Sequence, residues 1–283
     1  MQRAGDLLDG AARRLAAAGV SDARREARLL LAHLLQVSPG YLSTHPEAEV
    51  EEDAARSFAA FIERRSAREP ISHILGERDF WSLSFTVTAD TLAPRPDSET
   101  LVEAALSYFP DPQARFSVLD LGTGTGCLLL SILQERPNAT GLGLDKSPNT
   151  LEVARANAHR LGLEGRSAWM AGDWREANLG VFDLVISNPP YIPSGEIETL
   201  EPEVARYEPR LALDGGTDGL DAYRSLMTMV KKVLKPKGVL GLEFGLGQGA
   251  DVMALMQGAG LSHPRVFKDL AGIERCLFAT FGG

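Results

Sequence analysis

The most distinctive chemical feature of this 283-residue sequence is the segment Asn-Pro-Pro-Tyr at residues 188–191. Two consecutive prolines fix the backbone and donate no hydrogen bond, so the loop is stiff and its carbonyl oxygens stay free to accept. The Asn188 side-chain oxygen and the Pro189 carbonyl could each accept one N–H of a flat NH2 group, on which Tyr191 could stack. These two acceptors would raise electron density on a delocalised, weakly nucleophilic nitrogen. The loop, with Pro190 completing it, predicts a site for a planar amide or amino nitrogen, although Asn-Pro-Pro can also be only a rigid turn.

A glycine-rich loop, Asp-Leu-Gly-Thr-Gly-Thr-Gly, occupies residues 120–126 between an apolar segment and a helical one. Such a loop allows a tight turn and a close approach of ligand to backbone, and by itself it fits NAD, FAD, a phosphate or S-adenosylmethionine. A dinucleotide fingerprint requires glycine at its sixth position, which here is Cys127, and no P-loop ending follows. The alternating spacing therefore favours S-adenosylmethionine, whose sulfonium carries no phosphate. The candidate contacts are Gly122, Thr123, Gly124, Thr125 and Gly126.

Two further candidates for cofactor binding follow the next predicted strands. Asp145 lies about 20 residues beyond the glycine loop, where a carboxylate can accept hydrogen bonds from both hydroxyls of a ribose; it could instead complement a helix dipole. Trp174 could stack on a purine, or be a partly buried core aromatic. Because ligands of open parallel sheets bind outside the carboxyl ends of the strands, these residues and Asn188 should meet at one edge.

Together these residues predict a methyl transfer in which positioning does most of the work. Asn188, Pro189 and Tyr191 are the candidate catalytic residues, and Asn188 is also expected to border the cofactor. An acceptor nitrogen held in line with the bond between the sulfonium and its methyl group needs no strong general base.

The elements that must position these residues alternate between strands and helices after Pro96, which indicates an α/β fold with a mostly parallel sheet covered on both faces. One helix should begin with Ser147 as its N-cap and Pro148 in its first turn. Residues 265–281 should form a terminal antiparallel pair. Strands are expected at residues 117–122, 140–145, 167–173, 182–188 and 238–245, and helices at 126–136, 148–161 and 219–234.

The chain before this region has a different pattern. Apolar residues recur at helical spacing in three segments. These are residues 5–18, the segment that follows Ser21 as its N-cap, and residues 51–68, after which Pro70 ends the helix. Aromatic and β-branched residues then alternate as in a strand pair. We therefore expect three parts: a helical domain at 1–72, a linking β-hairpin at 73–96, and a catalytic domain at 97–283.

Composition narrows the class of partner. The net charge of −9 disfavours a nucleic-acid substrate, because a protein that binds phosphates usually carries a basic excess. No apolar run approaches the roughly 20 residues of a membrane helix, and the N-terminus does not resemble a secretory signal. Cys127 and Cys276 lack metal-ligand spacing and suit a reducing compartment. We expect a cytoplasmic protein with no metal, no membrane and no direct nucleic-acid partner.

Several segments together resemble the bacterial peptide chain release factor glutamine methyltransferase (HemK/PrmC) family over nearly the whole chain. The NPPY loop alone is shared with adenine and cytosine amino-methyltransferases, but PRPDSE and EVARYEPRLAL make the combination far more specific. One departure lies at Asp97-Ser98, where relatives more often carry Thr before the Glu. The segments are GERDFWSLSFTV, PRPDSE, LDLGTGTG, GLDKSP, GDW, SNPPYIP, EPEVARYEPRLALDGGTDG and GLEFGLGQG.

The resemblance implies a Rossmann-like class I S-adenosylmethionine methyltransferase fold with a small N-terminal helical domain that helps bind the substrate. It also implies N5-methylation of the glutamine in the Gly-Gly-Gln motif of class I release factors. On it, residues 122–126, Asp145, Trp174 and Asn188 match cofactor contacts, and residues 188–191 match the glutamine-binding loop. The roles of Arg95, Glu99 and residues 201–214, the oligomeric state and the preferred release factor stay open.

Three alternatives remain at this point. A nucleic-acid amino-methyltransferase would use the same loop but would need a basic cleft and a flipped base. A ribosomal-protein glutamine methyltransferase shares the site chemistry and would differ in its N-terminal region and its acceptor. A non-catalytic binding module with this fold is disfavoured by the intact set of loops.

Overall fold

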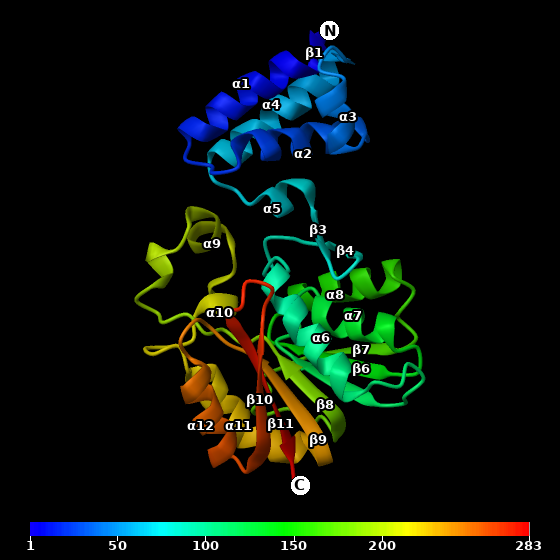
Figure 1. Cartoon of the computed structure of the whole chain (residues 1–283), viewed down its shortest axis with the longest axis vertical. Helices are drawn as coiled ribbons and strands as arrows, with labels where there is room; N and C mark the ends of the chain where they lie inside the picture. The colour runs from blue at the N-terminus through cyan, green and yellow to red at the C-terminus, as the bar shows by residue number, and fades with distance from the viewer. Residues whose placement is uncertain (283) are drawn as a thin grey trace. The chain divides into compact units, whose positions relative to one another are not determined.

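The computed structural model describes residues 1–282 and divides into two compact units (Figure 1). The first comprises Met1–Glu77 together with Glu201–Tyr207. The second comprises Arg78–Leu200 and the chain from Glu208 onward.

The first unit is a small helical domain. Leu8, Leu15 and Leu30 are among the side chains buried between its helices, as their helical spacing predicts. The prediction that Ser21 caps the second helix is wrong, because the N-cap residue is Asp22 and makes no side-chain capping bond. The elements are β1 (Gln2–Arg3), α1 (Ala4–Ala17), α2 (Ala23–Leu35), α3 (Pro39–Thr44), β2 (Glu49–Val50), α4 (Glu52–Ser66), α5 (Ile71–Leu75) and α9 (Pro202–Tyr207).

The segment Glu201–Tyr207 joins this unit through ion pairs that its sequence alone did not predict. The Arg65 guanidinium is 5% exposed and lies 2.8 Å from the Glu203 carboxylate, which also contacts Arg68 at 2.6 Å. A buried cation of this kind is tolerated only when it is paired and hydrogen-bonded. The segment therefore neutralises a charge inside the helical unit.

The second unit is built on a seven-stranded sheet in the order β10-β11-β9-β8-β5-β6-β7. β11 is antiparallel to both β9 and β10, and the other pairs are parallel, which confirms the predicted mixed sheet. A separate hairpin of β3 (Glu77–Phe80) and β4 (Leu83–Thr86) precedes it. The strands of the sheet are β5 (Ser117–Leu121), β6 (Thr140–Asp145), β7 (Ser167–Ala171), β8 (Phe182–Ser187), β9 (Leu234–Glu243), β10 (Leu261–Lys268) and β11 (Glu274–Phe281).

Helices cover both faces of this sheet, so its central strands are buried on both sides (Figure 1). Val118 packs into the core under α6, α7 and α8, and the adjacent Leu119 packs into the core under α11 and α12. This arrangement leaves the carboxyl ends of the parallel strands as the edge where loops can form a site. The helices are α6 (Glu99–Tyr108), α7 (Cys127–Glu135), α8 (Pro148–Arg160), α10 (Arg210–Leu213), α11 (Asp221–Val233) and α12 (Gly249–Gly258), with short 3-10 turns η1 (Pro96–Ser98) and η2 (Ile197–Thr199).

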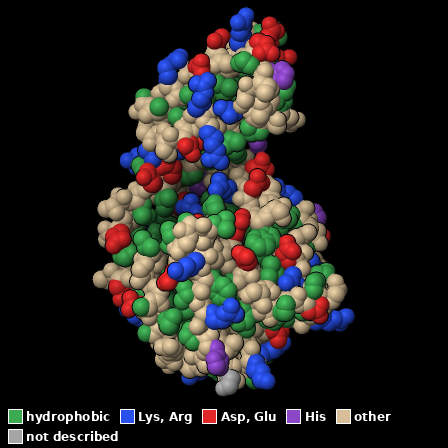
Figure 2. All heavy atoms as spheres, in the orientation of Figure 1, with side chains coloured by type: hydrophobic (Ala, Val, Ile, Leu, Met, Phe, Trp, Pro, Cys, Tyr) green, Lys and Arg blue, Asp and Glu red, His purple; other side chains and the backbone are tan. Residues whose placement is uncertain are grey.

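Acidic and basic side chains are interspersed over the face of the molecule seen in Figure 2. Within residues 1–282, none of the helices combines the length and the apolar character that crossing a membrane requires.

Candidate functional site

A cavity of about 390 Å³ lies in the second unit, where four loops leave the carboxyl ends of the parallel strands. Its volume falls within the roughly 300–1,000 Å³ of small-molecule sites. The wall includes glycines after β5, Asp145 at the end of β6, Trp174 after β7 and Asn188 after β8. The predicted candidates from these four loops are therefore brought to one place.

The glycine loop presents bare backbone to this cavity. Gly122 and Gly124 line the wall with φ of +74° and +56°, a left-handed region in which side chains other than hydrogen are strained. The Gly122 N–H donates to the carbonyl of Leu144 at 2.8 Å, and the Gly124 N–H donates to the Asp145 Oδ2 at 3.0 Å. The loop is thus fixed to β6, the neighbouring strand.

The other residues of the glycine loop pack against the protein interior and do not line the cavity. Thr123 and Thr125 are buried, and neither lines the cavity. The Thr123 hydroxyl donates to the Asp120 Oδ2 at 2.6 Å. A Cβ placed on Gly126 would lie 2.8 Å from the Trp169 ring. The predicted cofactor contacts of Thr123, Thr125 and Gly126 therefore stay predictions, and their visible role is to hold the backbone of the loop.

The Asp145 carboxylate is held by two backbone donors. Its Oδ2 accepts from Gly124 and its Oδ1 accepts from the Ser147 N–H at 3.0 Å. An ionised carboxylate offers about four acceptor sites, so each oxygen retains capacity for another donor. Since Asp145 lines the cavity, this arrangement suits a pair of neighbouring hydroxyls.

The Trp174 indole is fixed on the wall, and so are the charges around it. Its Nε1 donates to the Ser225 hydroxyl at 3.0 Å, and its ring lies 3.7 Å from where a Cβ on Gly122 would stand. The two basic side chains on the wall, Lys146 and Arg175, both pair with Asp173, and these contacts hold the pKa of that carboxyl far below its usual range. A cavity whose cations are already paired suits a cationic sulfonium better than a phosphate.

The acceptor loop contributes unequally to the cavity. Asn188 and Pro190 line it, whereas Pro189 is buried and Tyr191 is half-buried away from the wall. The Tyr191 ring packs so closely on Gly245 that a Cβ there would lie 2.9 Å from it. Burial raises the pKa of Tyr191 to about 12. The predicted stacking of Tyr191 on a substrate stays a prediction, while Asn188 is where the prediction places it.

Two buried carboxyl groups near these loops were missed as functional candidates. Asp120 is fully buried and Glu243 is 3% exposed, and burial raises the pKa of each to about 7. The side chains of Ser98 and Asn188 lie near the Glu243 carboxyl and lower its pKa, against the larger effect of burial. The available signal was an acidic residue at the end of an apolar strand, where charged groups are rarely buried without a partner.

The residues around PRPDSE have structural partners. Arg95 pairs with the buried Glu208 at 2.6 Å, and the Glu99 Oε1 accepts from the Trp81 N–H at 2.8 Å.

Burial raises the pKa of the Cys127 thiol to about 12, in keeping with a packing role. Among residues 1–282, no group of three or more His, Cys, Asp or Glu side chains could hold a metal ion.

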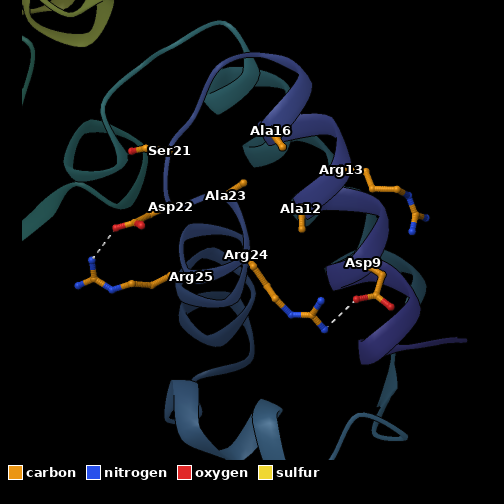
Figure 3. Close-up of a pocket in the computed structure, with 9 residues that line it drawn as sticks. All are labelled: Asp9, Ala12, Arg13, Ala16, Ser21, Asp22, Ala23, Arg24 and Arg25. Carbon is orange, nitrogen blue, oxygen red and sulfur yellow. Dashed lines mark hydrogen bonds and ion pairs between the residues drawn. The ribbon is translucent and has the colours of Figure 1, made fainter.

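A second hollow, of about 580 Å³, lies on the first unit between α1 and α2 (Figure 3). We call it the α1–α2 groove. Arg24 reaches Asp9 at 3.0 Å and Arg25 reaches Asp22 at 3.5 Å, as the dashed lines show. The arginine side chains are 70% or more exposed, so water screens these pairs. The groove is lined by Asp9, Ala12, Arg13, Ala16, Ser21, Asp22, Ala23, Arg24 and Arg25.

Comparison with known proteins accounts for both units. Residues 6–76 match the family model described as PrmC N-terminal domain, and residues 113–244 match one described as Methyltransferase domain. A release factor glutamine methyltransferase of Rhodospirillum rubrum is 52% identical, with 97% of this chain and 84% of the relative covered. One of the same name from Cereibacter sphaeroides is 47% identical, with 98% of both covered.

A solved structure shows the same fold at much lower identity. The ribosomal protein L11 methylase of Lactobacillus delbrueckii subsp. bulgaricus superposes with a TM-score of 0.51 and 15% identity, covering 69% of this chain and 83% of the other. This likeness concerns the fold alone.

Proposed function

This chain belongs to the release factor glutamine methyltransferase family, and we propose that it methylates the side-chain amide nitrogen (N5) of the glutamine in the Gly-Gly-Gln motif of class I peptide chain release factors. The proposed methyl donor is S-adenosylmethionine. The names of the relatives support this substrate, and the geometry of the cavity supports the chemistry.

One observation carries the chemical part of the proposal. Asn188 lies on the wall of the same cavity as Gly122 and Asp145, and its Nδ2 donates to the Ser98 hydroxyl at 3.2 Å. With the NH2 end of the side chain engaged in this way, the Oδ1 is available to accept a hydrogen bond. A methyl donor and an amide NH2 can therefore be held in one enclosed space.

The chain's own residues fit the proposed cofactor. Asp145 would accept from the ribose hydroxyls, Trp174 would pack against the adenine, and Gly122 and Gly124 would let the cofactor approach the backbone. When bound, S-adenosylmethionine supplies a methyl group made electrophilic by the sulfonium to which it is attached.

The acceptor side works by positioning. Asn188 Oδ1, on the cavity wall, would accept one N–H of the glutamine amide. The carbonyl of the adjacent Pro189, which does not line the cavity, is the proposed acceptor of the other N–H. The two bonds would restrict the rotation of the amide and raise electron density on its nitrogen. As the bond from the nitrogen to the methyl carbon formed, the bond from that carbon to sulfur would break to leave a neutral thioether. The nitrogen would release one proton to solvent water, so the second N–H is retained in the product. Because this proton leaves only as the new bond develops, hydrogen-bond acceptors suffice and no strong base is needed.

The charge of the protein supports a protein substrate over a nucleic acid. The net charge is −9, and both cations on the cavity wall are paired with Asp173. A nucleic-acid enzyme needs free basic groups to neutralise phosphates. Since release factors act on ribosomes, the proposed reaction takes place in the cytoplasm.

The test is a labelling experiment with three acceptors. The enzyme is incubated with methyl-labelled S-adenosylmethionine and, separately, a class I release factor, a mixture of ribosomal proteins, and DNA, and labelled products are mapped. We expect one label, on the glutamine of the Gly-Gly-Gln motif, and none when that glutamine is replaced by alanine. Label only on a ribosomal protein or only on DNA would overturn the proposed substrate.

A further inference from the structure

A buried carboxyl group lies directly behind the acceptor asparagine. β8 and β9 are parallel, and Ser187 pairs with Leu242, so the next residue of each strand, Asn188 and Glu243, emerge side by side. Glu243 is 3% exposed, and its Oε2 has no hydrogen-bond partner among residues 1–282. A carboxyl in such surroundings is costly, because desolvation of its charge is only partly offset.

The hydrogen bonds around Glu243 determine which end of the Asn188 amide faces outward. The Asn188 Nδ2 donates to the Ser98 hydroxyl at 3.2 Å, and interaction with these two side chains lowers the pKa of the Glu243 carboxyl against the larger effect of burial, so both lie within reach of it. An ionised carboxylate can only accept, so the hydroxyl and the NH2 group must both donate to it. Both N–H bonds of Asn188 are then engaged with the protein, and its Oδ1 is the atom left free.

We propose that Glu243 is a positioning residue which, with Ser98, fixes the amide of Asn188 so that its Oδ1 faces the acceptor nitrogen. This inference rests on the proposed function and adds to it the group that orients the acceptor site. A glutamine at position 243 could present either its oxygen or its NH2 group to Asn188. Only an acceptor-only group forbids the reversed orientation.

The charge state of Glu243 should therefore control turnover. Burial raises the pKa of Glu243 to about 7. The positive charge of Arg275 opposes this rise, and the negative charge of Asp97 adds to it. Arg275 and Asp97 form an ion pair of 2.8 Å with each other. Below that pKa the Glu243 carboxyl gains an O–H, which can donate to Asn188 Oδ1 and turn the amide around. Burial raises the pKa of each of the other titratable groups in electrostatic contact with Glu243, so these groups stay neutral near pH 7: Cys127, Tyr191, Tyr223 and Cys276.

The first measurement separates kcat from KM in the full-length enzyme. We expect Glu243→Gln to lower kcat on the release factor by about 10- to 100-fold while KM for S-adenosylmethionine changes little, as for a group acting in the transition state. Ser98→Ala should show a smaller loss, and Ser98→Thr, which keeps the hydroxyl, should restore kcat. The matched control is Asp183→Asn, which removes a carboxylate from the opposite end of β8 and should leave kcat unchanged.

The second measurement is the pH profile. For the parent enzyme, kcat should fall about tenfold per pH unit below about 7, since the active form is ionised at Glu243. The Glu243→Gln variant should lack this acidic limb. Asp120 has a similarly raised pKa, so the limb should persist in Asp120→Asn if Glu243 is its source.

A readout without substrate keeps the inference separate from the proposed function. The side-chain NH2 resonances of Asn188, identified by their loss in Asn188→Ala, should shift with pH through about 7 in the parent and not in Glu243→Gln. The inference would be overturned, while the proposed function stands, by three results in folded Glu243→Gln. These are an unchanged kcat, a fall of kcat below pH 7 like that of the parent, and Asn188 NH2 resonances that still shift with pH through about 7. Absence of glutamine methylation by the parent enzyme would overturn the proposed function instead.

Discussion

The cavity at the sheet edge and the α1–α2 groove, of about 390 Å³ and 580 Å³, both carry polar side chains on their walls. In the cavity, hydrogen bonds to the protein fix the polar side chains. Asp145 accepts from two backbone N–H groups and Asn188 donates to Ser98, so their remaining acceptor atoms have a fixed direction. In the groove, Arg24 and Arg25 pair with acidic neighbours in open solvent.

On the proposed function, the fixed direction of its polar groups, not its volume or charge, distinguishes the cavity from the surface groove. An exposed ion pair contributes about 0–1 kcal/mol and leaves its side chains mobile. A polar group whose partners fix it contributes far more to a reaction, since it needs no reorganisation as charge develops. The following substitutions measure that contrast in both hollows, from the largest expected effect to the smallest.

Asn188→Ala removes the oriented acceptor of the cavity. We expect kcat on the release factor to fall by about 100- to 1,000-fold, the usual effect of deleting one preorganised polar group, with the Kd for S-adenosylmethionine within a few-fold of the parent. Single-turnover kinetics and calorimetry measure the two quantities. Arg25→Ala in the groove is the control and should leave both unchanged. Turnover within a few-fold of the parent would remove Asn188 from the acceptor site.

Asp145→Ala removes the carboxylate that faces the predicted ribose. Hydrogen bonds to a charged group contribute about 1.5–3 kcal/mol, so the Kd for S-adenosylmethionine should weaken by about 10- to 150-fold. At saturating cofactor, kcat should recover most of its value. Asp22→Ala, which removes a groove carboxylate, should bind the cofactor like the parent in calorimetry. Equal affinity for S-adenosylmethionine in both variants would show that the Asp145 carboxylate contributes no more to cofactor binding than a groove carboxylate.

Gly126→Ala tests whether the cavity wall depends on backbone that only glycine can adopt. The φ at this residue is +79°, and a Cβ would lie 2.8 Å from the Trp169 ring. Strain and crowding together should destabilise the fold by about 1–3 kcal/mol in denaturant unfolding. Gly165→Ala is the matched control, because open space surrounds its Cβ and its φ is not positive. Equal stability of the two variants would contradict the requirement for glycine at residue 126.

Arg24→Ala should have the smallest effect. The pair it forms with Asp9 is largely exposed, so the free energy of unfolding should change by less than about 1 kcal/mol. Methylation of the release factor should stay at the parental rate. A large fall in the rate, with the fold intact, would show that the groove contributes to substrate binding.

Much of the fold and part of the site followed from local patterns. The alternation of strands and helices predicted the mixed sheet, and the four loops at its carboxyl edge predicted where Gly122, Asp145 and Asn188 meet. These features depend on the periodicity of apolar residues and on the dihedral preferences of glycine and proline, which each stretch of chain carries by itself.

Other features required the packed structure. Whether Thr123 faces a ligand or Asp120 depends on how the loop settles on its neighbours, and the side of the loop on which Tyr191 packs depends on Gly245. The pairing of Arg65 with Glu203 joins residues far apart in the chain.

The sequence by itself predicted the main strands of the sheet, the glycine loop and the stiff acceptor loop, because these are properties of short segments. Only the tertiary structure placed Glu243 behind Asn188, since that contact depends on the register of two strands separated by α9, α10 and α11 in the chain. The orientation of a polar side chain at the site depends on its hydrogen-bond partners, and those partners come from distant segments that folding brings together.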